Sequence, residues 1–533
     1  FICIFLSVIF INKFNYCLNN ILIENYVLFK YFVEIYWEII YNNINDYNYR
    51  RQKMIFNSFD FIIFFIIVVF LHYTLPHKFR WIMLLIASCI FYMCWRPELI
   101  LLLLFSTFVN WGISLLIDKH RDRAKGLLIL SLIINFGLLF VFKYMMFINH
   151  TFMDIYNYFG WEYPINDFNI ILPMGISFYT FQAASYTIDI YWDGYKPEKN
   201  YFKFTLFITF FPQLVAGPIE RADRLLGQLF TVKKINVNNF TEGIKLMIMG
   251  YFKKIVIADR AAMLVDTVFN NCREYNGIAF IIAALFFSFQ IYGDFSGYSD
   301  IARGCAKILG IDLMYNFDKP YFSKSIKEFW RRWHISLSTW IRDYIYIPLG
   351  GSRCSRERKY FNLMVTFLAS GLWHGANWTY VLWGGIHGMF QVIGDIKNTF
   401  MPKMDNFVVN FFRIIITFLL VAFAWIFFRA NTISDAFYIV GHLFNDIGRI
   451  TDAQYIYEMF NNFGLQLFEI LLVAGAILIL MLSEMISYKS EDIDKFMDKV
   501  PFVFRFAYYY VLVIIIFGIG VFSGGGQFIY FQF

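Results

Sequence analysis

Long apolar stretches recur along almost the whole chain and constrain its fold more than any other feature. A helix needs about 20 apolar residues to cross the hydrocarbon core of a bilayer. Stretches close to that length lie near residues 58–75, 81–95, 97–117, 126–148, 171–191, 201–217, 243–260, 278–293, 361–374, 376–395, 407–428, 465–486 and 503–522. We therefore expect an all-α, polytopic integral membrane protein with about 11–13 transmembrane or re-entrant helices.

The composition supports a lipid environment. The chain is 59% hydrophobic and 16% charged, whereas soluble domains are roughly 45–50% apolar and about 25% charged. The net charge of +7 is interpreted as a bias of cytoplasmic loops rather than as a nucleic-acid footprint. We expect the basic loops 118–125 and 353–359 to face the cytoplasm, as in a multi-pass protein of a bacterial inner membrane. The seven cysteines form no CxxC pair, so neither a zinc site nor a disulfide framework is indicated.

Residues 1–53 differ in composition from the rest of the chain. They contain no Gly, Ala, Pro, Thr, His or Met, as expected if an AT-rich stretch of DNA were read in frame. The residues before Met54 can be encoded by AGG-AGG-CAA-AAA, a purine-rich sequence typical of a ribosome-binding site. We therefore predict that residues 1–53 are an untranslated upstream extension and that 54–533 form one membrane domain. The alternative is an additional helix at 21–40.

Three of the eight histidines, His334, His374 and His387, lie within 54 residues of one another. Hydrocarbon disfavours an imidazolium ion, so a histidine at membrane depth stays neutral and can accept a proton from a hydroxyl. Each of them alone could instead form a hydrogen bond between packed helices. A metal site is not expected, because no HExxH pair or Cys cluster accompanies them and their separations of 40 and 13 residues fit no common zinc motif.

The segment 329–344 mixes aromatic residues, arginines and hydroxyls, and it is too short to span a bilayer. If this segment forms a single helix, the i, i+4 spacing places four residues on one face: Trp330, His334, Ser338 and Ile341. Arg331 and Arg332 would lie on another face. The segment is interpreted as an interfacial amphipathic helix, which can also form the wall of a cavity.

Two further polar features interrupt the apolar pattern. The segment DFSGYSD at 294–300 has the wrong spacing for a nucleophile elbow, so a Ser–His–Asp triad is unsupported. Its position predicts helix capping, with Asp294 or Asp300 orienting a histidine or binding a polar headgroup. The prolines in the segment 212–221 predict a local break, either a structural kink or an unwound stretch that lines a cavity.

Five motifs in order carry a resemblance to a known family. They are FPQLVAGPIERA, FSGYSDIARGCAKILGI, FWRRWHISLSTWIRDYIYIPLGGSR, GLWHGANWTYVLWGGIHG and the closing FIYFQF at 528–533. Together they resemble the membrane-bound O-acyltransferases, and the similarity extends from Met54 to Phe533. The resemblance implies a ring of helices around a funnel, with an acyl donor on the cytosolic side and an acceptor arriving from outside.

The resemblance also implies roles for the histidines. By motif position, His374 is similar to the family's essential histidine and His334 to a second recurrent one, whereas His387 matches one that is common in the alginate branch. His374 would act as the general base. His334 and Asn377 would orient the acceptor or donate to the developing oxyanion, and Trp373 would form the wall of a slot.

The implied reaction is O-acetylation of an extracytoplasmic polysaccharide such as alginate. Acetyl-CoA would be the donor substrate, and no bound cofactor is expected. Arg331 and Arg332 would attract the phosphates of acetyl-CoA. Anchoring at the membrane interface explains the presence of these two arginines equally well. A serine hydrolase-like acyltransferase outside the membrane would be the partner. Three alternatives stay open: D-alanyl transfer to teichoic acid within the same family, a polytopic transporter, and a scaffold for polysaccharide secretion.

Overall fold

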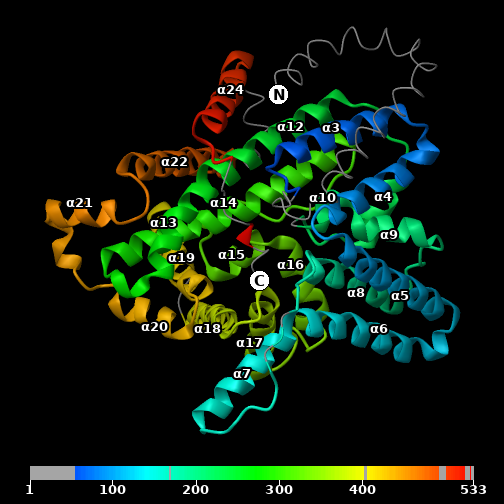
Figure 1. Ribbon diagram of the computed structural model, residues 1–533, viewed down its shortest axis with the longest axis horizontal. Coiled ribbons are helices and arrows are strands. Elements are labelled where there is room, and N and C mark those ends of the chain that lie inside the picture. Colours follow the sequence, from blue (N-terminus) through cyan, green and yellow to red (C-terminus); the bar gives the residue numbers. More distant parts are fainter. Residues whose placement is uncertain are drawn as a thin grey trace. The chain divides into compact units, whose positions relative to one another are not determined.

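A computed structural model describes residues 54–166, 168, 170–215, 217–400, 405–490, 500–522 and 528–529. All regular structure in these ranges is helical, as the apolar stretches predict (Figure 1). The prediction for residues 1–53 lies outside the described residues. The start at Met54 and the single domain over 54–533 therefore stay predictions.

The first part of the described chain forms eleven α-helices and two π-helical segments. They are α3 (Phe59–Thr74), α4 (His77–Met93), α5 (Ile100–Lys119), α6 (Ala124–Leu139), η3 (Phe140–Tyr144), α7 (Met145–Tyr158), α8 (Ile176–Asp193), α9 (Tyr201–Thr209), α10 (Phe211–Leu214), α11 (Ala222–Phe230), α12 (Val237–Tyr251), η4 (Phe252–Ala258) and α13 (Asp259–Asn270). The bounds of α3, α5 and α8 follow predicted apolar stretches, whereas α11 and most of α13 lie outside them.

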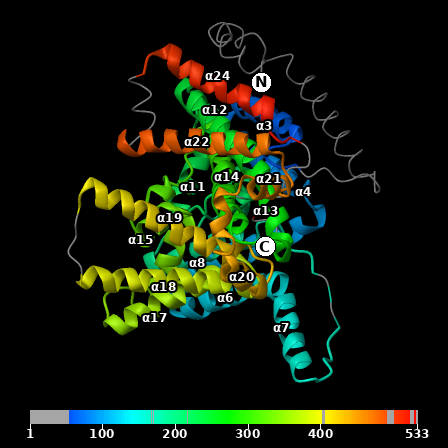
Figure 2. The ribbon, with the colours of Figure 1, turned by 90° about the vertical axis from the view of Figure 1, so that its left-hand side faces the viewer.

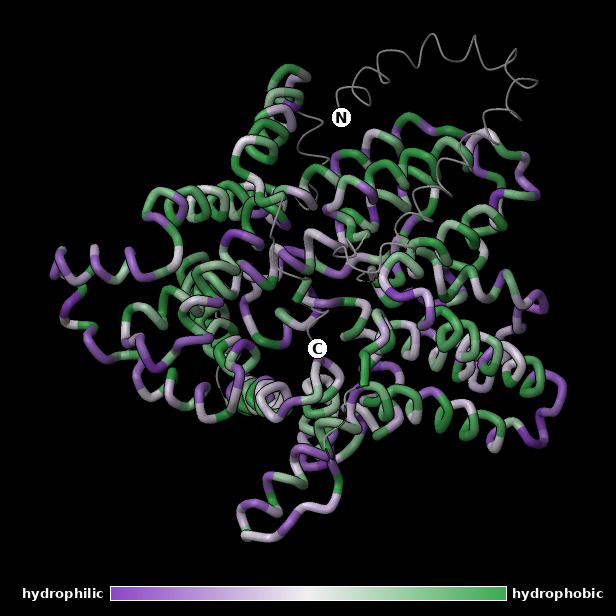
Figure 3. Tube along the Cα trace, viewed as in Figure 1, coloured by the Kyte–Doolittle hydropathy of each residue, from purple (hydrophilic) through white to green (hydrophobic). Residues whose placement is uncertain are grey.

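The second part continues the same pattern. Its α-helices are α14 (Ile278–Ile308), α15 (Ile326–Arg332), α16 (Ile335–Ile341), α17 (Arg356–His374), α18 (Trp378–Phe400), α19 (Phe407–Arg429), α20 (Ile433–His442), α21 (Ala453–Asn461), α22 (Leu467–Ser490) and α24 (Phe502–Ile519). In Figure 3, hydrophobic residues dominate the helices and hydrophilic residues gather in the connections.

Five helical stretches within the described ranges are long and apolar enough to cross a membrane. They are Pro97–Lys119, Arg121–Tyr158, Ile278–Ile308, Phe407–Arg429 and Leu467–Tyr488. The other predicted spans form helices that are shorter, broken or less apolar. The break that the prolines predicted lies between α9, which ends at Thr209, and α10. Pro212 lies in the first turn of α10, where its missing N–H is tolerated.

Helix α14 runs further than the sequence indicated. The predicted span ended at residue 293, but the helix continues to Ile308, so the expectation that Asp294 and Asp300 cap a helix end is wrong. Both carboxylates lie within the helix because lysines of the neighbouring segment η4 neutralise them. Close packing of α12 against α14 is visible in Figures 1 and 2.

The expected single helix over 329–344 is also wrong. It breaks at His334, whose φ of 43° is in the left-handed region, and this residue separates α15 from α16. The backbone on either side of the break bonds to the preceding loop. Asp318 N–H donates to the carbonyl of Arg332, and Ile335 N–H donates to that of Asn316.

Helices α17 and α18 form a tightly packed pair (Figure 2). A Cβ on Gly371 would collide with the carbonyl of Tyr380, and one on Gly384 would collide with the carbonyl of Phe367. Only glycine permits this backbone approach. The glycines near the predicted base therefore serve close packing between helices.

Candidate active site

His374 is the last residue of helix α17. The following residue, Gly375, is extended (φ −165°, ψ 153°), so the chain turns away from the helix axis at the histidine. The His374 side chain is 2% exposed. Its ring lies 5.0 Å from that of Trp383 and 5.5 Å from that of Phe428. The predicted base is thus held in an aromatic enclosure at the end of a rigid element.

His334 reaches the same enclosure from another part of the chain. Its ring lies 6.2 Å from that of His374, 5.8 Å from that of Trp373 and 4.6 Å from that of Phe295. The left-handed turn directs the side chain inward, and such strained backbone concentrates at functional sites. The structure therefore brings together two of the three histidines that the sequence indicated.

His387 lies on the far side of Trp383, with ring centroids 5.0 Å apart. It is fully buried, and its Nδ1 accepts a hydrogen bond of 3.2 Å from the indole Nε1 of Trp330. This arrangement fits a histidine that packs between helices and supports the wall of the enclosure.

Two cavities adjoin this region. The smaller, of about 40 Å³, is lined by His374 and Trp373. The larger, of about 550 Å³, is lined by Asn377 among other polar residues. Lys143 and Leu172 line both cavities. His374 therefore lies at the wall of a small cavity that shares two lining residues with the larger one.

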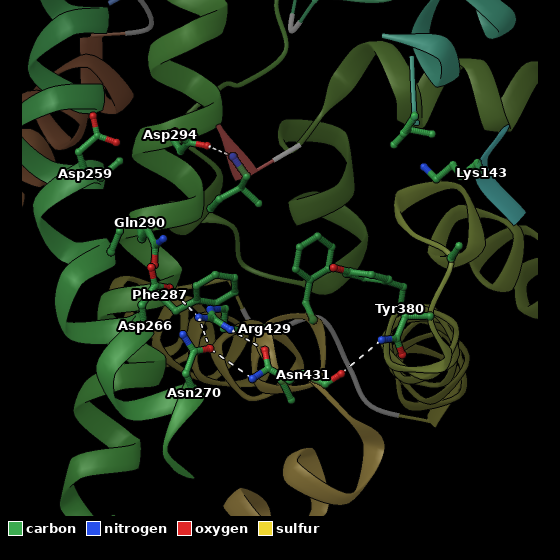
Figure 4. Close-up of a pocket in the computed structure, with 18 of the residues that line it drawn as sticks. Lys143, Asp259, Asp266, Asn270, Phe287, Gln290, Asp294, Tyr380, Arg429 and Asn431 are labelled. Atoms are coloured by element: carbon green, nitrogen blue, oxygen red, sulfur yellow. Dashed lines mark hydrogen bonds and ion pairs between the residues drawn. The ribbon is translucent and has the colours of Figure 1, made fainter. Parts of the chain in front are cut away.

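Polar side chains surround the larger cavity (Figure 4). Arg429 donates to Asp266 over 2.6 Å and to Asn270 over 3.2 Å, and Asn377 donates to the carbonyl of Asn431 over 3.3 Å. Asp259, Asp294 and Gln290 lie across the cavity from Lys143 and Tyr380. Carboxylates, amides and aromatic rings around one cavity suit a ligand with hydroxyl groups.

Asp294 belongs to a buried ion cluster at the edge of this cavity. Lys254 donates to Asp259 over 2.7 Å and to Asp294 over 2.5 Å. The second oxygen of Asp294 accepts the backbone N–H of Ile529 over 2.8 Å. Asp294 therefore fastens the end of the described chain to helix α14, and its oxygens are engaged by Lys254 and Ile529.

Five of the predicted site residues do not line either cavity: His334 and His387, described above, and Arg331, Arg332 and Asp300. Arg331 is exposed, and Arg332 pairs with Glu328 and Asp318. Asp300 pairs with Lys253 over 2.8 Å and with Arg303 over 3.5 Å. The suggested role of the arginines in attracting a phosphate-bearing donor stays a prediction.

The sequence analysis missed other residues that line the cavities, including Lys143, Tyr380 and Arg429. A signal for Lys143 was present, because it is the one charged residue in the apolar stretch 126–148. An ionisable residue inside a membrane helix is costly and marks a functional site by default. Tyr380 and Arg429 lie near helix ends, where such residues are common and carry no signal of their own.

Comparisons with known proteins agree with this architecture. A model of the membrane-bound O-acyltransferase family matches residues 197–434. A probable alginate O-acetylase of Pseudomonas aeruginosa is 41% identical over 387 residues, which cover 72% of this chain and 73% of that protein. A peptidoglycan O-acetyltransferase of Helicobacter pylori is 34% identical, covering 73% and 79%. A teichoic acid D-alanyltransferase of Streptococcus thermophilus is 29% identical, covering 44% and 64%.

A helical fold with the buried His374 beside a cavity agrees with the acyltransferase class that these comparisons show. The chain belongs to the membrane-bound O-acyltransferase family. This assignment confirms the resemblance drawn from the five motifs, and it favours an acyltransferase over a transporter or a scaffold.

Proposed function

We propose that the chain takes an acetyl group from acetyl-CoA on the cytoplasmic side of a bacterial inner membrane and passes it to a hydroxyl acceptor on the other side, for O-acetylation of an extracytoplasmic polysaccharide. Relatives named for O-acetylation, one of alginate and one of peptidoglycan, each match more than 70% of the chain. The observation that carries the proposal is the position of His374, which is buried among aromatic rings, lies beside a second imidazole and lines a cavity.

In the proposed reaction, the acceptor oxygen bonds to the carbonyl carbon of the thioester and the carbon–sulfur bond breaks. His374 takes the proton from the hydroxyl and returns it to the departing sulfur, so coenzyme A leaves as a thiol and no further reactant is needed. A positioned general base contributes typically about 10²–10⁴ in rate. Holding donor and acceptor in line supplies much of the remainder.

Two further residues have roles in this proposal. His334, at the far side of the same enclosure, orients the acceptor or donates to the developing oxyanion. Asn377 lines the larger cavity, where an acceptor from outside would enter. A serine hydrolase-like protein outside the membrane would receive the acetyl group and modify the polysaccharide.

Transfer of D-alanine to teichoic acid is the second candidate. It is favoured by one observation, the teichoic acid D-alanyltransferase relative at 29% identity. That relative covers 44% of this chain, whereas the O-acetylating relatives cover more than 70%. Acetyl transfer is therefore preferred.

The proposal is tested with His374→Ala in a strain that lacks its own copy of the gene. His120→Ala is the matched control, because His120 is exposed in the loop between α5 and α6. The measurement is the ester-linked acetyl content of the isolated surface polysaccharide. We expect His374→Ala to abolish acetylation at normal expression and His120→Ala to preserve it. Full acetylation in the His374→Ala strain would refute the proposal. D-alanyl esters instead of acetyl esters on the wild-type polysaccharide would establish the second candidate.

A further inference from the structure

The ammonium group of Lys143 is buried against the end of the helix that carries His374. The side chain is 8% exposed. Its Nζ donates to the carbonyl of Trp373 over 2.6 Å, to the carbonyl of His374 over 3.3 Å and to Oγ of Ser177 over 3.2 Å. These three bonds use all the donors of an ammonium group. Lys143 is therefore fully engaged in holding one end of one helix.

Helix chemistry explains why a cation lies at this point. The last four carbonyls of an α-helix have no partner within the helix, and together they carry a partial negative charge. Helix α17 ends at His374, so Lys143 satisfies two of these carbonyls. Tyr144 donates from its hydroxyl to a third, the carbonyl of Leu372, over 2.8 Å. Two consecutive residues thus fasten the last turn before the histidine.

The segment that carries these two residues is itself unusual. Lys143 and Tyr144 belong to η3, a π-helical turn inside the long helical stretch Arg121–Tyr158. Such turns occur frequently at functional sites, because the extra residue redirects side chains. In the described residues no carboxylate forms a salt bridge with Lys143, so its buried charge depends on the carbonyls and the hydroxyl. A buried charge is costly, which argues against an incidental lysine here.

The position of Lys143 in the fold agrees with a role at the reaction centre. It lines both cavities, and His374 lines the smaller one. At 1.5 Å per residue, Lys143 lies about 28 Å from the start of α6 at Ala124, in the basic loop 118–125, and His374 lies about 27 Å from the start of α17 at Arg356, in the basic loop 353–359. The two residues therefore meet at one depth if both loops face the same side, as predicted.

We infer that Lys143 is a positioning residue for acyl transfer, which fixes the last turn of α17 so that the His374 ring keeps its place at the cavity wall. The inference rests on the proposed function of His374. Without the ammonium, the carbonyls of Trp373 and His374 lose their donor and the last turn can unwind or rotate. A displacement of about 1 Å at a reacting group can lower a rate about 100-fold.

The test measures kcat and KM for acetyl-CoA in membrane vesicles that contain the full transfer system, per amount of folded protein. Lys143→Met keeps the length of the side chain but removes the charge and the donors. We expect its kcat to fall about 100-fold with an unchanged KM for acetyl-CoA. Lys143→Arg, which keeps a cation, is expected to recover part of this loss. Lys125→Met is the matched control, because it makes the same substitution at an exposed position near the start of the same helical stretch, and we expect it to keep the wild-type kcat.

Each outcome discriminates. Wild-type kcat in folded Lys143→Met, with His374→Ala inactive, would overturn the inference and leave the proposed function intact. Activity in His374→Ala would overturn the proposed function itself. Lys143→Gln is measured in parallel in case the methionine variant does not fold, and wild-type kcat in that variant would equally contradict the positioning role. A merely structural lysine would lower the folded amount without changing kcat.

Discussion

The rings of His334 and His374 lie 6.2 Å apart and meet at 65°, although 40 residues separate them along the chain. Each is placed by its backbone, His334 by a left-handed turn and His374 by the end of a helix. Because both positions depend on how helices and loops pack, substitutions outside the enclosure are expected to affect acyl transfer through the position of these rings.

The contact between α17 and α18 gives a first prediction. Gly384→Ala would place a methyl group against the backbone of α17 and push the two helices apart. Overpacking of this kind costs typically about 1–3 kcal/mol. We expect a lower melting temperature in detergent and a loss of polysaccharide acetylation. Gly394→Ala is the control on the same helix, because a Cβ there would meet nothing within 4 Å. Indistinguishable behaviour of the two variants would contradict the prediction.

His387 is expected to act by packing. His387→Leu leaves the indole N–H of Trp330 without an acceptor, which costs about 1–3 kcal/mol in a buried site. His387→Asn offers a side-chain oxygen in place of Nδ1 and should retain more stability. Both variants should keep acetyl transfer when rates are divided by the amount of folded protein. A folded but inactive His387→Asn would instead show a direct role in the reaction.

The buried ion cluster is expected to be essential for folding. Lys254→Met leaves the carboxylates of Asp259 and Asp294 buried without their cation, and breaking a buried pair in this way costs about 3–5 kcal/mol. Folded yield and melting temperature should fall sharply, and adding Asp294→Asn should recover part of the loss. Lys125→Met, in an exposed position near the start of α6, is the control. Wild-type melting of Lys254→Met would rule out this account of the cluster.

Stability is expected to depend on pH through Glu220. This residue lies in the connection between α10 and α11, outside the membrane-spanning segments. It is fully buried, accepts the N–H of Met314 and lies 3.9 Å from Arg224. Burial raises the pKa of Glu220 from its ordinary value of 4.5 to about 7. Between these values the folded chain binds more protons than the unfolded chain, so stability falls as the pH rises.

Glu220→Gln cannot titrate and keeps an oxygen for the Met314 N–H. Its melting temperature should therefore decline less than that of the wild type between pH 5 and 7. The measurement is thermal unfolding in detergent at several pH values in this range. Equal slopes for the two proteins would show that Glu220 does not contribute to the pH dependence.

Features that depend on local sequence could be predicted. The apolar stretch at 407–428 became α19 (Phe407–Arg429), and the prolines marked the break between α9 and α10. The length of an apolar run and the missing N–H of proline act within a few residues, so no tertiary information is needed. The clustering of three histidines in the sequence likewise indicated the region in which the rings of His334 and His374 meet.

Features that depend on distant partners could not be predicted. The turn at His334 is set by hydrogen bonds from the preceding loop, and α14 continues past Asp294 because Lys254 approaches from another segment. The role of Lys143 could not be predicted for the same reason. Its partners include backbone carbonyls about 230 residues away in the sequence, and every residue carries a backbone carbonyl, so the sequence does not indicate which of them Lys143 contacts.

The most direct test of the account compares wild type with His374→Gln in membrane vesicles that contain the full transfer system. The measurement is the initial rate at which radiolabelled acetyl groups pass from acetyl-CoA to the polysaccharide. The substitution keeps the size and polarity of the side chain but removes the base. We predict a rate lower by at least about 10², the typical contribution of a general base, at an equal amount of folded protein. A rate equal to that of the wild type would contradict the central role of His374.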